Sequence, residues 1–130
     1  MRISRPRLST DLLMWTGLLA APAAWAAQLV TGVWLQIARC HDRAVGAAPG
    51  LPVDVITVAV GAVAAALALV GLGAAIAAWR ATRDAEEDDA PPAGRVHFMG
   101  VIGMTISPLF LAMIVMSSAG GTAIAECVQS

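Results

Sequence analysis

Two cysteines are the residues of this chain best suited to form a specific covalent link. Cys40 and Cys127 are the only two in the sequence, and an even number of thiols in an oxidising compartment favours a disulfide. Two independent free cysteines are the alternative interpretation. A metal site built on Cys40, His41 and Cys127 is disfavoured. Asp42 adds no useful ligand to it, because Asp42 follows His41 directly and adjacent side chains on one turn seldom converge on one ion. We therefore predict a Cys40–Cys127 disulfide and no metal site.

Gln28 is the most polar side chain within a long apolar segment. An amide surrounded by lipid and apolar side chains finds its hydrogen-bond partners on other helices. We interpret Gln28 as such a helix–helix contact, with a quinone or substrate contact as the alternative. Copper binding is disfavoured because the methionines concerned do not share one helix face and methionine commonly fills uneven gaps: Met99, Met104, Met113 and Met116.

Enzymatic and nucleic-acid-binding functions find little support in the sequence. The eight basic residues are all arginines and the net charge is −1, so no basic field is present that could neutralise phosphates. The spacings G-x-x-x-x-G-K, H-E-x-x-H, C-x-x-C and Ser-His-Asp do not occur. No titratable side chain lies deep in an apolar segment to act as acid, base or nucleophile. We expect no catalytic residues and no cofactor.

The elements that position these residues are three apolar segments. The chain is 58% hydrophobic and 13% charged, whereas soluble domains are about 45–50% apolar and about 25% charged. Uncharged runs cover 12–38, 55–79 and 98–125, each longer than the roughly 20 residues that cross a bilayer as a helix. The sequence predicts one all-α membrane domain over 1–130 with spans at about 12–38, 55–79 and 98–119. The alternative for the first span is a cleavable signal peptide, because arginines precede a short apolar run and Ala24-Trp25-Ala26.

Arginines beside the spans predict the orientation. Three precede the first span and three lie in the acidic connection 80–97, whereas two lie in the connection 39–54. Because cytoplasmic loops retain positive residues, we expect the N-terminus in the cytoplasm and the C-terminus outside, in a bacterial inner membrane. Cys40 and Cys127 then follow the outer ends of spans one and three, where a disulfide could join them.

Small and amide side chains lie on four-residue stripes in the first and second spans, and small ones gather on one side of the third. The first span carries Ala20, Ala24, Gln28, Gly32 and Gln36; the second carries Gly61, Ala65, Gly73 and Ala77; the third carries Gly100, Gly103 and Ser107. Small residues allow close backbone approach, and amides hydrogen-bond across helices. We therefore expect helix packing at Gln28, Gly32, Gln36, Gly61, Gly73, Gly103 and Ser107.

Residues of the first and third spans also carry a family resemblance. They read Trp15-x-Gly17-Leu18-Leu19-x-x-Pro22-x-x-Trp25-x-x-Gln28 and Arg95-x-x-Phe98-x-x-x-Ile102-Gly103-x-x-x-Ser107-x-Leu109-Phe110, with one cysteine outside the first span and one near the terminus. The chain resembles small three-helix proteobacterial membrane proteins encoded near cytochrome c oxidase genes. The resemblance implies a noncatalytic accessory subunit or assembly factor of a haem–copper cytochrome c oxidase in the respiratory chain.

The alternative function is a self-assembling transport or pore protein. The glycine-rich second span and Gln28 would then line the path. Carriers and pores usually place a charged side chain at the site of the translocated species, and the three uncharged runs provide none. We therefore favour the accessory subunit.

Overall fold

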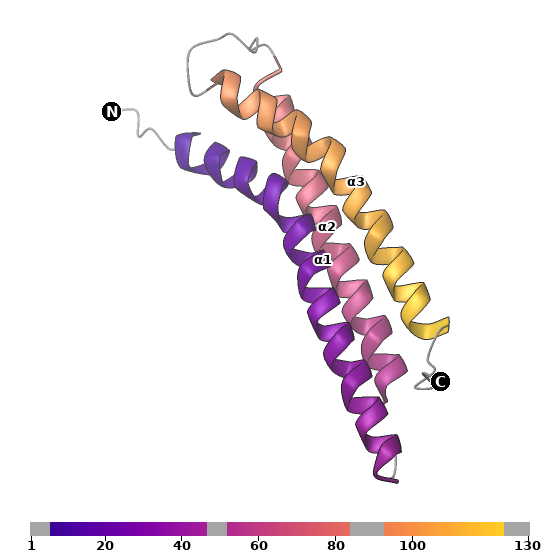
Figure 1. The fold of residues 1–130 in the computed structure, drawn as a ribbon. Coiled ribbons are helices and arrows are strands. Elements are labelled where there is room, and N and C mark those ends of the chain that lie inside the picture. The colour runs from indigo at the N-terminus through magenta and orange to yellow at the C-terminus, as the bar shows by residue number, and fades with distance from the viewer. Residues whose placement is uncertain (1–5, 47–51, 84–92, 124–130) are drawn as a thin grey trace.

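The computed structural model describes residues 6–46, 52–83 and 93–123 as three long helices (Figure 1). Helix α1 covers Pro6–Ala44, α2 covers Val53–Ala81 and α3 covers Ala93–Ala123. Stretches of 31, 29 and 28 residues within them are long and apolar enough to cross a membrane. The prediction of an all-helical chain with three such segments is confirmed, and it indicates a multi-pass membrane protein.

The surface of the bundle is apolar, as a chain dissolved in lipid requires. In the most apolar window of each helix only 22% of the residues are buried inside the bundle, so most of these side chains face outward. Val30, Trp34, Leu109 and Met116 are 71%, 67%, 66% and 74% exposed. A water-soluble bundle would carry polar side chains at such positions. The outward face therefore needs a nonaqueous environment.

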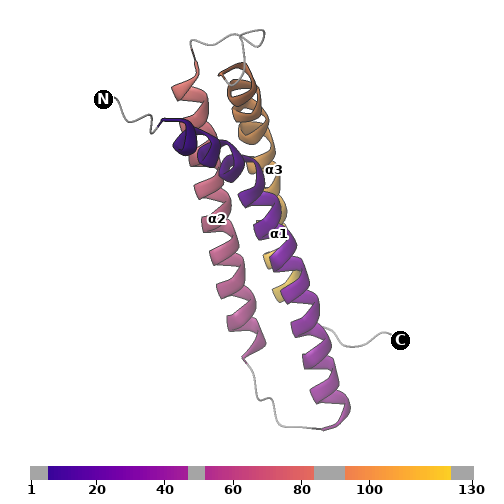
Figure 2. The same cartoon turned by 90° about the vertical axis from the view of Figure 1, so that its left-hand side faces the viewer.

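Helix α1 bends in its N-terminal third, where its first turns lean away from the axis of the rest (Figures 1 and 2). Pro22 lies inside this helix. Proline has no N–H to donate to the carbonyl one turn earlier, and its ring crowds that carbonyl. The bend follows from these two effects, as the sequence predicts.

The three helices pack together pairwise, and small residues make the contacts. One buried cluster consists of Ala21, Ala24, Ala64, Ala68 and Ile114, with Trp25 and Phe110 packed against it. Those two rings meet edge to face with centroids 5.5 Å apart. A second cluster, of Met14, Ala78 and Val96, lies toward the other end of the bundle. Because most of these core side chains are alanines, which are small, the backbones of the three helices approach closely.

The closest approach of all three helices is at Gly17, Ala75 and Gly103. A Cβ atom placed on Gly17 would lie 2.8 Å from the backbone nitrogen of Ala75, and one on Gly103 would lie 2.9 Å from Ala75 Cβ and 3.0 Å from Gly17 O. Ser107, one turn along α3, donates a hydrogen bond to the same Gly17 carbonyl at 3.5 Å. Only glycine fits at Gly17 and Gly103 without moving a helix.

Candidate functional site

Gln28 ties α1 to α3 near the middle of the first membrane-spanning segment. Its side chain is 7% exposed. Its Nε2 donates to the carbonyl of Ile114 at 3.2 Å and to Ser118 Oγ at 2.8 Å. Ser118 in turn donates to the Ile114 carbonyl at 2.9 Å. Both amide protons of Gln28 and the hydroxyl proton of Ser118 are therefore used in one small network.

The other end of the same amide has no partner. Gln28 Oε1 is buried and accepts no hydrogen bond from the described part of the chain. The amide cannot simply be turned over, because its oxygen would then face the Ile114 carbonyl, an acceptor without a proton. A buried acceptor without a donor costs about 1–3 kcal/mol, and in native proteins such atoms are rare.

Gln28 also lines a cavity that opens among the three helices. The cavity has a volume of about 340 Å³ and takes its walls mainly from α1, with one side each from α2 and α3. Its lining residues are Gln28, Leu29, Gly32, Val33, Leu35, Gln36, Ile37, Thr57, Val60, Ser117 and Gly121. Most of this wall is apolar, and Leu29, Val33 and Ile37 are themselves exposed to the surroundings of the bundle. The cavity therefore opens to the outer surface of the bundle and is not a closed core cavity.

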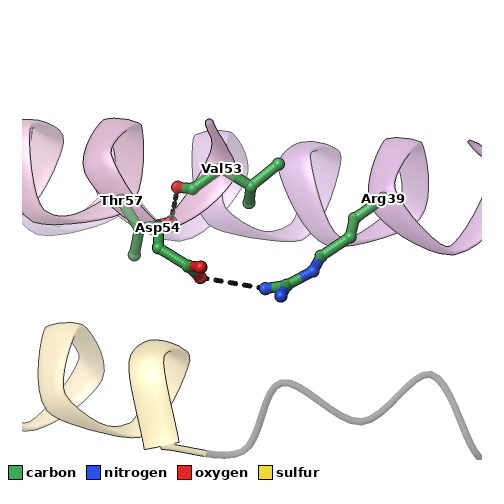
Figure 3. A network of polar contacts seen from close by, with 4 residues as sticks. All are labelled: Arg39, Val53, Asp54 and Thr57. Atoms are coloured by element: carbon green, nitrogen blue, oxygen red, sulfur yellow. Dashed lines mark hydrogen bonds and ion pairs between the residues drawn. The ribbon is translucent and has the colours of Figure 1, made fainter. Parts of the chain in front are cut away.

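An ion pair joins α1 and α2 near the connection between these two helices (Figure 3). Arg39 Nη1 donates to Asp54 Oδ1 at 3.0 Å, with the two side chains 19% and 65% exposed. Thr57, which lines the cavity, donates to the Val53 carbonyl at 2.8 Å. Asp54 also lies in the first turn of α2, where the helix dipole favours an acid. The ion pair thus joins α1 and α2 at a place where the Asp54 side chain is exposed.

Four of the residues expected at helix contacts meet another helix. These are Gln28, Gly61, Gly103 and Ser107: a Cβ on Gly61 would collide with the Ser118 hydroxyl, and Ser107 is 1% exposed. Gln36 is half-buried and lines the cavity.

Gly32 and Gly73, also expected at helix contacts, meet no other helix. A Cβ on either would have nothing within 4 Å, so neither contacts another helix of this bundle, and their packing against a helix of another protein stays a prediction. The physical reason is the period. Buried residues of α1 recur as Met14, Gly17, Ala21, Ala24, Gln28 and Leu35, alternating steps of three and four as in left-handed helix packing. A strict four-residue stripe drifts off this line.

The same three-and-four spacing would have found two contact glycines that the expected helix contacts omit. A Cβ on Gly17 would lie 2.8 Å from Ala75 N, and one on Gly71 would lie 3.0 Å from Ala20 Cβ. Gly17 lies one heptad before Ala24 and Gly71 one heptad before Ala78, and both alanines are buried.

The predictions for the cysteines and histidines have different outcomes. Cys40 is half-buried near the end of α1 and is not a free cysteine, but Cys127 lies outside the described residues, so the pairing stays a prediction. Within the described ranges no group of three or more His, Cys, Asp or Glu side chains could hold a metal ion. His41 is exposed. His97 lies near the other end of the bundle, with Nδ1 3.4 Å from Thr82 Oγ1.

Comparisons with known proteins add no relative to this picture: no family model, no curated protein and no solved structure matches the chain.

Proposed function

We propose that this chain is a noncatalytic accessory subunit or assembly factor of a larger membrane complex, and that it docks through the outward face of α2. The observation that carries the proposal is a line of small residues on that face. Ala59, Ala62, Ala66, Gly73 and Ala77 are all exposed, and we call them the α2 seam. Their separations of three, four, seven and four residues keep them on one side of the helix.

The seam differs from the other outward surfaces of the bundle. The exposed side of α1 carries Trp15, Leu19, Val30, Val33 and Trp34, and that of α3 carries Leu109, Met113, Val115 and Met116. On α2 itself the exposed Val63, Leu69 and Val70 flank the seam. Large aliphatic and aromatic side chains suit contact with lipid tails.

Small side chains suit a second helix, because dispersion forces grow when two backbones approach closely and lipid offers no equivalent packing. Grooves of about 280 and 360 Å³ lie along the two sides of α2 near Ala59 and Ala62. They would receive the side chains of a helix laid over the seam.

The first partner to test is a haem–copper cytochrome c oxidase. This choice rests on the family resemblance of the first and third spans alone. The orientation with a cytoplasmic N-terminus, the bacterial inner membrane and the Cys40–Cys127 bridge belong to the same proposal, and they rest on the arginine distribution and the cysteine positions in the sequence.

The experiment is copurification in a gentle detergent of the tagged full chain expressed in its own host, followed by mass spectrometry and haem spectra. Ala66→Phe should reduce the recovered partner about 10-fold, since overpacking costs about 1–3 kcal/mol. Ala112→Phe is the matched control, because Ala112 is also exposed but lies on α3 outside the seam. Equal recovery with both variants, or recovery of further copies of this chain alone, would contradict the proposal; the second result would support the pore alternative.

A further inference from the structure

The unpaired oxygen of Gln28 and the cavity beside it point to a ligand. We propose that the 340 Å³ cavity between α1, α2 and α3 binds a membrane-soluble molecule whose polar head donates a hydroxyl hydrogen bond to Gln28 Oε1 and whose apolar body fills the remaining space. No residue of the α2 seam lines this cavity, and the two proposals are tested with different variants.

The requirement for a donor from outside follows from the protons around Gln28. Its own Nε2 protons go to Ile114 O and Ser118 Oγ, and the Ser118 proton goes to Ile114 O. Thr31 donates to the Ala27 carbonyl and Thr57 to the Val53 carbonyl, each at 2.8 Å. These hydroxyl groups have thus already committed their protons, and Ser117, which also lines the cavity, donates no hydrogen bond to Gln28 Oε1.

Gln36 does not supply the missing proton either. It lies two helical turns beyond Gln28, about 12 Å along the axis at 1.5 Å per residue, which exceeds the reach of two glutamine side chains on one face. At mid-membrane the surroundings are apolar, so an unsatisfied acceptor keeps most of its penalty. A bound hydroxyl would remove it.

The chemistry of the wall narrows the class of ligand. The lining is mainly apolar and the cavity borders exposed Leu29, Val33 and Ile37, so the ligand enters from lipid and carries an apolar part. The vacant group is an acceptor, so the head must be an O–H donor. Two membrane-soluble classes share this chemistry: a reduced quinol and a neutral glycerolipid with a free hydroxyl.

Access to the oxygen requires a small movement of the wall. Oε1 has less than 1 Å² of accessible surface. Gln28 and Val60 line both this cavity and the groove of about 280 Å³ on the α1–α2 side, so these two side chains form the partition between the two spaces. Turning the Val60 side chain would admit a hydroxyl group. Val60→Ala should therefore increase binding.

The test is native mass spectrometry of the full chain released from nanodiscs that contain a decyl-substituted benzoquinol or a diacylglycerol. The mass of the retained molecule tells the two classes apart. The dimethyl ether of the quinol and the methyl ether of the diacylglycerol lack the donor and should be retained about 10-fold less, as expected for one lost hydrogen bond to a buried group. Gly32 lines the cavity and a Cβ there meets nothing within 4 Å, so Gly32→Leu adds a side chain in the cavity and should abolish retention. Gly120→Leu is the control, because a Cβ there also meets nothing within 4 Å and Gly120 does not line the cavity.

Two outcomes would overturn the proposal. One is that neither hydroxyl probe is retained by wild type or by Val60→Ala. Water would then be the donor to Gln28 Oε1. The other is equal retention of the hydroxyl and methyl ether forms, or undiminished retention in Gly32→Leu, which would mean nonspecific lipid carry-over. Loss of copurification by Ala66→Phe has no bearing on either result, so failure of the docking seam and failure of this site are distinguishable.

Discussion

Gly17→Ala places one methyl group at the closest crossing of the three helices, where its cost can be worked out from the structure. The new Cβ would lie 2.8 and 2.9 Å from the backbone nitrogen and Cα of Ala75. Backbone atoms of a long helix cannot turn aside as a flexible side chain can, so α1 and α2 must separate. Overpacking of this kind costs about 1–3 kcal/mol.

Helix propensity acts in the opposite direction. Alanine is favoured over glycine in a helix interior by about 0.8–1.0 kcal/mol. Because the contacts with Ala75 are rigid, we expect the upper part of the overpacking range and a net loss of about 1–2 kcal/mol in the free energy of unfolding. Gly103→Ala should behave similarly, since its Cβ would meet Ala75 Cβ at 2.9 Å and Gly17 O at 3.0 Å.

The assay is reversible unfolding in mixed micelles by increasing the fraction of denaturing detergent, followed by circular dichroism. Gly120→Ala is the matched control, because nothing lies within 4 Å of its Cβ position. That variant gains only the propensity term and should be more stable than wild type by up to about 1 kcal/mol. If Gly17→Ala were as stable as Gly120→Ala, the close packing around Ala75 would be refuted.

Three further predictions concern charge, redox state and orientation. Arg39→Ala should lower the free energy of unfolding by less than about 1 kcal/mol, because Asp54 is 65% exposed and such pairs are screened. A loss above about 2 kcal/mol in the same micelle titration would contradict this expectation. Thiol labelling of denatured chains should find no reactive cysteine before reduction and both afterwards, whereas two labelled thiols without reductant, in protein protected from air, would exclude the Cys40–Cys127 bridge. A periplasm-active reporter fused after Ser130 should be active and a cytoplasm-active one silent; the reverse would invert the arginine argument and remove the expected oxidising environment of both cysteines.

The positions of the helices could be predicted because charge marks the limits of a membrane span. Asp11, Arg39, Asp54, Arg80 and His97 mark limits of the uncharged runs. Helices α1 and α2 contain the first two runs, and α3 covers the third as far as Ala123. They also extend past them, since α1 begins at Pro6 and ends at Ala44. A helix keeps its backbone hydrogen bonds after it leaves the apolar layer, so apolarity locates the core of a span and not its ends.

The candidate site could be predicted only in part. Gln28 stands out in the sequence because an amide in an apolar run requires partners, and the structure gives it Ile114 and Ser118. Its unpaired oxygen and the adjoining cavity depend on how far α3 lies from α1 along their length. That distance follows from the summed packing of many small side chains, for which no single residue gives a signal.

For a similar reason, the sequence reasoning did not separate glycines that contact another helix of the bundle from glycines that face outward. Gly61 and Gly73 both fit a four-residue stripe, but only Gly61 falls on the three-and-four line that faces α3. Gly73 faces outward instead, where it joins the α2 seam. Small residues thus mark two different surfaces of α2, and the sequence reasoning treated them as one.

The central claim, that the chain acts as part of a larger membrane complex, is tested most directly by its size in native gels of gently solubilised host membranes. The claim predicts that the 13.3 kDa chain comigrates with a much larger complex. If the partner is an oxidase, this position coincides with a haem-staining band. Deletion of the gene should lower the amount of that complex. Migration of this protein alone, together with an undiminished complex in the deletion strain, would contradict it.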